Sequence, residues 1–200
     1  DSSQVERSDS CKGNHINLLY VGKLLKGKGL TVILDSMKII CSRKAEQFHK
    51  IKLNVVGSGA DDEELRRYAE DLNLTNITDF KGYIDNPEIL SEIYCSADIF
   101  IMSSIDSEGL PRVIEEAQLH GLPVIATNNG GVPLLYENRE NILLVPRQDA
   151  AALADAISEI VENVVLRQKL IRNGLAFAES RLTSKTAARQ HAEVILGETL

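Results

Sequence analysis

Two carboxylates bracket a short segment whose residue types could hold a phosphate. Glu108 and Glu116 stand eight positions apart, and Gly109, Leu110 and Pro111 follow the first of them. Gly109 lets the backbone approach a ligand closely, and Pro111 fits the first position of a helix, where its missing N–H costs nothing. The free N–H groups at such a helix start, together with the helix dipole, favour an anion. The pattern therefore predicts a phosphate site made of backbone amides.

The two carboxylates need a different explanation, because negative charges beside a phosphate repel it. Each could accept hydrogen bonds from hydroxyl groups, as on a ribose or a hexose. Alternatively, Glu108 caps the helix and Glu116 is a solvated residue on its face. The spacing alone leaves both interpretations open.

A basic loop lies elsewhere in the chain, between an expected strand and an expected helix. Segment 23–29 holds three lysines and two glycines, at the carboxyl end of a strand, where open α/β sheets bind ligands. Lys23 and Lys28 could reach a pyrophosphate as point charges. The alternative is an ordinary solvated loop.

Short apolar runs alternate with helical patterns along the chain, which predicts an α/β fold: a Rossmann-like, doubly wound, parallel six-stranded sheet flanked by helices. Further helices are expected at the C-terminal end, over 150–164, 166–181 and 183–196, with Gly174 at a bend. The expected strands are 16–22, 51–57, 77–80, 98–102, 122–127 and 142–145. Their exit loops should meet at one edge of the sheet, which would gather Lys23, Lys28, Gly57, Ile84, Glu108 and Gly131.

Bulk properties exclude several classes of protein. The net charge of −7 and the pI near 5.2 argue against a nucleic-acid groove. Three widely spaced cysteines suggest neither a zinc site nor a disulfide framework, and they favour a cytoplasmic location. We find no apolar run of transmembrane length and no secretory leader. Gly57-x-Gly59 is followed by Asp62 where a dinucleotide fingerprint needs a third glycine, so a nicotinamide or flavin site is disfavoured.

In its ordered motifs, the chain resembles the C-terminal, donor-binding domain of retaining glycosyltransferases of the GT-B type, in the large family-four group (glycosyl transferases group 1). The resemblance runs from about Ile16 to Leu196. The motifs that carry it are Val21-Gly22-Lys23 with Lys28-Gly29, Val56-Gly57-Ser58-Gly59, Gly82-Tyr83-Ile84, Ala97-Asp98-Ile99-Phe100, Glu108-Gly109-Leu110-Pro111, Glu115-Glu116-Ala117, 121–127, Gly130-Gly131-Val132-Pro133 and Leu143-Leu144-Val145-Pro146.

The resemblance implies a role for each matching position. Glu108 would contact the transferred sugar and Glu116 the ribose. The backbone around Gly109, Leu110 and Pro111 would bind the phosphates. Lys23, next to Gly22, and Lys28 would clamp the diphosphate and stabilise the charge that grows on the leaving group. Ile84 would mark the loop whose backbone holds the base.

Three positions depart from the family pattern. Lys23 stands where arginine is usual and keeps the charge without the bidentate fork. Leu134 stands where a glutamate is usual after Gly-Gly-x-Pro, and Ile142 where a glycine is common. These departures concern the sugar pocket and leave the expected fold unchanged.

The implied activity is transfer of a sugar from a nucleotide diphosphate sugar to a glycan, lipid-linked or small-molecule acceptor, without a metal ion or other cofactor. Residues 1–15 are expected to form a linker or frayed end, and 16–200 the donor-binding domain. An N-terminal acceptor-binding domain is expected ahead of Asp1, so this chain alone should be inactive. That domain would also decide whether the protein associates peripherally with the inner face of the membrane. Two alternatives remain: a sugar-nucleotide epimerase of the same architecture, and a non-catalytic nucleotide-binding module.

Overall fold

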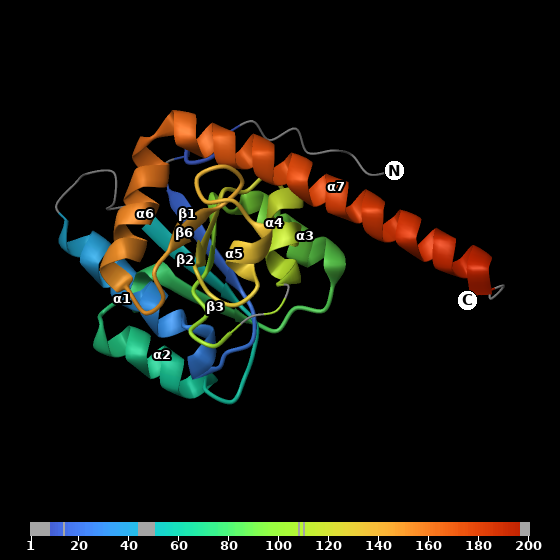
Figure 1. Ribbon diagram of the computed structural model, residues 1–200. Coiled ribbons are helices and arrows are strands. Elements are labelled where there is room, and N and C mark those ends of the chain that lie inside the picture. Colours follow the sequence, from blue (N-terminus) through green and yellow to red (C-terminus); the bar gives the residue numbers. More distant parts are fainter. Residues whose placement is uncertain (1–8, 14, 44–50, 108, 110, 197–200) are drawn as a thin grey trace.

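The computed structural model describes residues 9–13, 15–43, 51–107, 109 and 111–196, and these residues form one α/β domain around a parallel sheet (Figure 1). Six strands pair in the order β3-β2-β1-β4-β5-β6, and every pairing is parallel. Their bounds are β1 Ile16–Val21, β2 Ile51–Val56, β3 Thr78–Gly82, β4 Ile99–Met102, β5 Val124–Thr127 and β6 Leu143–Val145. The predicted doubly wound six-stranded sheet is therefore confirmed.

The central strands β4 and β5 are buried along their whole length because helices cover both faces of the sheet. All four residues of β4 and all four of β5 are buried, as expected for a parallel sheet between two helical layers. Strand β3 continues two residues past the predicted end at Phe80, to Gly82. The pattern missed this extension because Lys81 and Gly82 carry no apolar signal.

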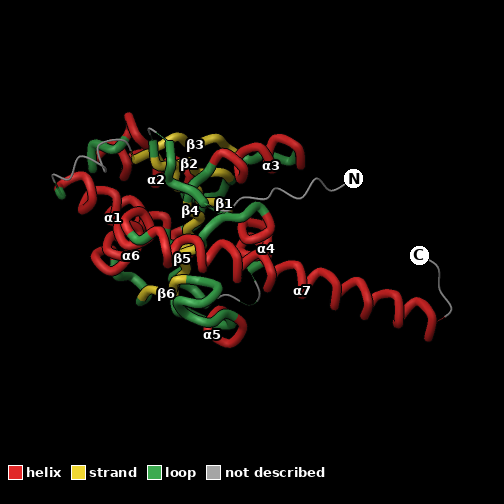
Figure 2. Tube along the Cα trace, turned by 90° about the horizontal axis from the view of Figure 1, so that it is seen from above, coloured by secondary structure: helices red, strands yellow, loops and turns green. Residues whose placement is uncertain are grey.

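Helices lie on both sides of the sheet, as Figure 2 shows, with α1, α2 and α6 on one side and α3, α4 and α5 on the other. The helices are α1 Leu30–Ser42, α2 Asp62–Asp71, α3 Pro87–Ser96, α4 Arg112–Leu119, α5 Val132–Leu135, α6 Ala150–Glu162 and α7 Val164–Leu196, with short 3-10 turns η1 Lys26–Lys28 and η3 Thr75–Ile77.

Local sequence explains where several helices begin. The side chain of Asn86 accepts a hydrogen bond from the Ile89 amide at 3.0 Å, and Pro87 occupies the first turn of α3. Asp149 caps α6 in the same way, accepting from the Ala152 amide at 2.8 Å. The buried side of α1 carries Ile33 and Met37, in agreement with its apolar periodicity.

The C-terminal region corrects one expectation. Segments 166–181 and 183–196 were predicted to be separate helices, whereas α7 is continuous over both. Neither proline nor glycine interrupts it at Leu182. Gly174 marks a close contact with α4: a β-carbon there would lie 3.1 Å from the Gln118 Cγ atom.

Residues 9–11 already pack on the domain ahead of β1. Arg167 of α7 donates from Nε to Asp9 Oδ1 at 2.7 Å, and both side chains are about 95% buried, with 4% and 5% exposed. The Cys11 amide donates to Asp98 Oδ1 at 2.7 Å, just before β4. Helix α7 therefore crosses the amino-terminal edge of the sheet. Strand β1 starts at Ile16 as expected, but the packed segment begins earlier, and residues 1–8 lie outside the described residues.

A bilayer-spanning helix is not found among the described residues, because none of their helices combines the required length with sufficient apolar character.

Candidate functional site

A cavity of about 590 Å³ opens at the carboxyl ends of β1, β2 and β3. Its lining comes from the last residues of β1 and β2, from the three exit loops and from helix α3. The lining residues are Val21, Gly22, Lys23, Val56, Gly57, Ser58, Gly59, Tyr83, Ile84 and Leu90. Three of the predicted donor-binding residues, Gly22, Lys23 and Ile84, thus meet in one cavity.

Glycines allow the loops around this cavity to approach one another. Gly57 has φ of +137°, and a β-carbon there would lie 1.8 Å from the carbonyl oxygen of Gly22. A β-carbon on Gly59 would lie 2.2 Å from the carbonyl oxygen of Leu24. The close packing that shapes the cavity wall therefore requires these glycines.

The loop after β1 is tied to the exit loops on both of its sides. The Leu24 amide donates to the Ser58 carbonyl at 3.0 Å, beside β2. The Gly27 carbonyl accepts from the amides of Ile105 and Asp106 at 2.8 and 2.9 Å, beyond β4. The loop that carries the lysines is thus a fixed part of the sheet's carboxyl edge.

The three lysines of this loop differ in their surroundings. Lys23 is exposed and forms no ion pair with another described residue. Lys26 is engaged, since its Nζ lies 2.9 Å from Glu64 Oε2. Lys28 is half-buried in η1 and does not line the cavity. Because the described lining contains Lys23 but no acidic residue, the cavity favours an anionic ligand.

The structure describes the segment before α4 only in part. Glu108 and Leu110 lie outside the described residues, so their predicted roles stay predictions. Gly109 is exposed, and a β-carbon on it would meet no atom within 4 Å. Helix α4 begins at Arg112, which places Pro111 at the N-cap, one position ahead of its predicted place. Its φ of −73° still leads into the helix, whose first amides have no partner within the helix.

Glu116 lies half-buried on α4 and faces α3. Its Oε2 atom accepts a hydrogen bond from the Tyr94 hydroxyl at 3.1 Å. Tyr94 lies one turn beyond Leu90 on α3, so the helix side that lines the cavity also carries the partner of Glu116. Glu116 itself does not line the cavity. Its neighbour Glu115 points elsewhere, to Arg181 Nε of α7 at 2.6 Å.

Tyr94 and Val56 are site residues that sequence reasoning missed. The sequence pattern predicts Val56, at the end of a strand, to be a core residue. It predicts Tyr94 to be one of the apolar positions of an amphipathic helix. A buried tyrosine needs a partner for its hydroxyl, but that partner is 22 residues away on another helix. Only the spacing of Leu90 and Tyr94, both on the inner side of one helix, could have pointed to this contact.

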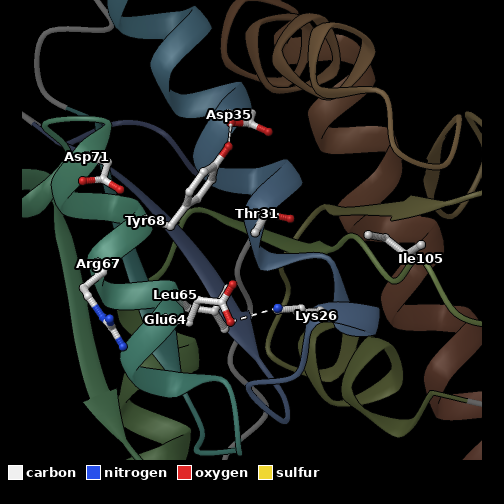
Figure 3. Close-up of a pocket in the computed structure, with 9 residues that line it drawn as sticks. All are labelled: Lys26, Thr31, Asp35, Glu64, Leu65, Arg67, Tyr68, Asp71 and Ile105. Atoms are coloured by element: carbon white, nitrogen blue, oxygen red, sulfur yellow. Dashed lines mark hydrogen bonds and ion pairs between the residues drawn. The ribbon is translucent and has the colours of Figure 1, made fainter.

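A second cavity, of about 640 Å³, lies between α1 and α2 (Figure 3). The polar groups that face each other across it already pair: Tyr68 donates to Asp35 Oδ1 at 2.7 Å, and Lys26 pairs with Glu64. It contains none of the predicted site residues. We therefore place the candidate site at the cavity beside Lys23 and Ile84.

Comparison with known proteins agrees with this architecture. Residues 4–177 match the family model described as Glycosyl transferases group 1. The D-inositol 3-phosphate glycosyltransferase of Paenarthrobacter aurescens is 29% identical over 187 residues, which cover 91% of this chain and 45% of that protein. The phosphatidyl-myo-inositol mannosyltransferase of Mycobacterium leprae is 33% identical over 147 residues, covering 74% and 37%. The chain thus spans less than half the length of these curated relatives.

Solved structures share the fold. Anabaena HepE, whose structure was determined in complex with UDP-glucose, superimposes with a TM-score of 0.79 at 25% identity. The superposition covers 92% of this chain and 50% of that one.

Proposed function

Because the chain belongs to the group 1 glycosyl transferases, we propose that it binds a nucleoside diphosphate sugar in the cavity at the carboxyl ends of β1, β2 and β3. It presents that sugar for transfer with retention of configuration to a glycan, lipid-linked or small-molecule acceptor. The observation that carries the proposal is the convergence of Gly22, Lys23 and Ile84 on this one cavity. The complex of HepE with UDP-glucose supports a UDP-sugar as the first donor to test.

Each part of the donor has a counterpart in the chain. The base lies against the apolar wall made by Val56, Ile84 and Leu90. The diphosphate lies near Lys23, with Lys28 and the amides at the start of α4 on its other side. Glu116 accepts hydrogen bonds from the ribose hydroxyls. For the sugar itself, the residue we propose is Glu108.

The chemistry follows from the charge that develops during transfer. When the bond between sugar and diphosphate breaks, negative charge grows on the leaving phosphate. Lys23, Lys28 and the helix start stabilise this charge, and preorganised groups of this kind lower the barrier most effectively. In this reaction the lysines take the place of a metal ion, so chelation by EDTA should leave nucleotide binding unchanged.

A partner domain completes the proposal. Acceptor binding and the remaining catalytic groups belong to an N-terminal domain, and this chain alone does not turn over donor. If that domain attaches to the membrane, the reaction takes place at its cytoplasmic face. The epimerase alternative is not favoured, since the relatives named above are transferases.

Nucleotide binding provides the test. UDP, GDP and ADP are titrated into the chain by calorimetry, and the melting temperature is followed in parallel. A bound ligand stabilises by mass action, by about 2.7 kcal/mol at a hundredfold excess over its Kd. We expect one nucleotide to bind and Glu116→Ala to weaken it strongly. If none of the three binds, the proposal is wrong.

The non-catalytic alternative needs a separate measurement. In a protein that also contains the acceptor domain, Glu108→Gln should abolish sugar transfer if Glu108 contacts the reacting sugar. Unchanged transfer in that variant would favour a nucleotide-binding module with another role.

A further inference from the structure

Among the described residues, the carboxylate of Glu116 is held by one side chain, that of Tyr94. Tyr94 is almost completely buried, with 1% of its surface exposed, and its hydroxyl donates to Glu116 Oε2 at 3.1 Å. The other oxygen, Oε1, has no hydrogen bond to another described residue. One oxygen of the carboxylate is thus fixed by the protein, and the other remains available to accept hydrogen bonds.

The ring of Tyr94 is itself held firmly. It stacks on the His120 ring at a centroid distance of 4.9 Å and an interplanar angle of 17°. Phe100 of β4 lies 6.0 Å from it in a tilted arrangement. The hydroxyl therefore has little freedom to leave Glu116.

His120 connects the same elements a second time. Its Nδ1 lies 2.7 Å from the backbone carbonyl of Glu116. Because a carbonyl only accepts, Nδ1 carries the proton. In the neutral ring, Nε2 then accepts from the Ser91 hydroxyl of α3, 2.9 Å away. Both the side chain and the backbone of Glu116 are thus fixed by groups that belong to, or contact, α3.

The protonation of the Tyr94 hydroxyl supports its role as a hydrogen-bond donor. Burial raises the pKa of Tyr94 well above its usual range, and the negative charge of Glu116 raises it further. The phenol therefore keeps its proton near neutral pH. The hydroxyl can therefore donate its proton to Oε2 of Glu116.

We infer that Tyr94 is a positioning residue for nucleotide recognition: by binding Oε2 of Glu116 it orients Oε1 to accept hydrogen bonds from the ribose hydroxyls. This inference rests on the proposed function, which supplies the ribose. Tyr94 contacts no ligand itself and acts only through Glu116.

The experiment compares a ribonucleotide with its counterpart that lacks the ribose hydroxyls. Whichever of UDP, GDP and ADP binds most tightly is titrated beside its 2′,3′-dideoxy form, into the wild-type chain and into Tyr94→Phe. Phenylalanine keeps the ring and its stacking on His120 and removes only the hydroxyl. Tyr68→Phe is the matched control, because it removes another tyrosine–carboxylate hydrogen bond, to Asp35 at 2.7 Å, away from the site.

The wild-type chain should bind the ribonucleotide more tightly than the dideoxy form. Tyr94→Phe should weaken ribonucleotide binding about five- to tenfold, the loss of roughly one hydrogen bond, and leave dideoxynucleotide binding unchanged. Tyr68→Phe should keep the wild-type ratio of the two affinities, and Glu116→Ala should abolish it.

The outcomes separate this inference from the proposed function. If the wild-type chain binds no nucleotide, the proposed function fails and takes the inference with it. If it binds and Tyr94→Phe keeps the full ratio, the inference alone is wrong. It is also wrong if Tyr94→Phe weakens both nucleotides equally, since that result reports a general effect on the fold.

Discussion

The carbonyl oxygen of Gly22 occupies the space that a β-carbon on Gly57 would need, 1.8 Å from that carbon's ideal position. The two glycines come from the exits of neighbouring strands, and the Gly22 amide donates to Val56 at 3.0 Å just beside them. The contact brings the backbones of two loops together on the wall of the candidate cavity. The shape of the cavity wall therefore depends on the lack of a side chain at position 57.

Replacing Gly57 by alanine should therefore destabilise the fold. The backbone strain alone is expected to cost about 1–3 kcal/mol, since φ of +137° is almost closed to alanine, and the collision with Gly22 adds to it. Denaturant unfolding measures the change. Gly82→Ala is the matched control: Gly82 has φ of +74° with no atom within 4 Å of its added β-carbon. Equal losses in the two variants would show that the collision does not matter.

Lys23→Gln should weaken nucleoside diphosphate binding. The exposed lysine acts on the phosphates as a point charge, so the loss should be largest at low ionic strength and shrink as salt screens the charge. Lys26→Gln should leave the Kd unchanged, because Lys26 is engaged by Glu64 at 2.9 Å. Calorimetric titration at two salt concentrations compares the variants. A larger effect for Lys26 than for Lys23 would contradict the assignment.

Asp9 should make stability depend on pH in the acid range. Burial alone would raise its pKa, but the hydrogen bond from Arg167 and the nearby positive charge outweigh burial and lower it. A lowered pKa stabilises the fold above the unfolded value of about 3.9, and this contribution disappears as the pH falls through the folded value. Asp9→Asn should thus be less stable than wild type at pH 7, with the gap closing below about pH 4. A gap that stays constant down to the acid transition would count against this role.

Cysteine alkylation should distinguish Cys11 from the other two cysteines. Burial raises the pKa of Cys11 to about 11, whereas Cys41 and Cys95 are exposed. Since the thiolate is the reactive form, iodoacetamide at pH 8 should label Cys11 last, and fully only after denaturation. Mass spectrometry of the digested protein gives the order. Early labelling of Cys11 would mean that residues 9–11 are not packed as described.

Much of the fold could be predicted because its signals are local. Apolar runs such as the predicted strand 98–102 act within a few residues, and their order along the chain determines a doubly wound sheet. The boundary at Leu182 was wrong because the chain there has no helix-breaking residue, and packing did not require a break.

The site could be predicted only where the chain has short motifs. The lysine loop and the loop carrying Ile84 belong to strand exits, so topology alone brought Lys23 and Ile84 together. The contacts of Tyr94 with Glu116, and of Arg181 with Glu115, join polar groups far apart in sequence. Such pairs produce no periodic pattern in the sequence, so they can be identified only once the packing of the helices is known.

Helix α7 touches both layers of the domain. Leu166 and Leu170 join the apolar cluster under α1 and α6, whereas Phe177 packs with the cluster under α4, and Figure 1 shows the helix running on past the sheet. If the helices of either layer separated from the sheet, apolar residues of α7 that pack against that layer would become exposed to water. The two halves of the core should therefore melt in a single cooperative transition.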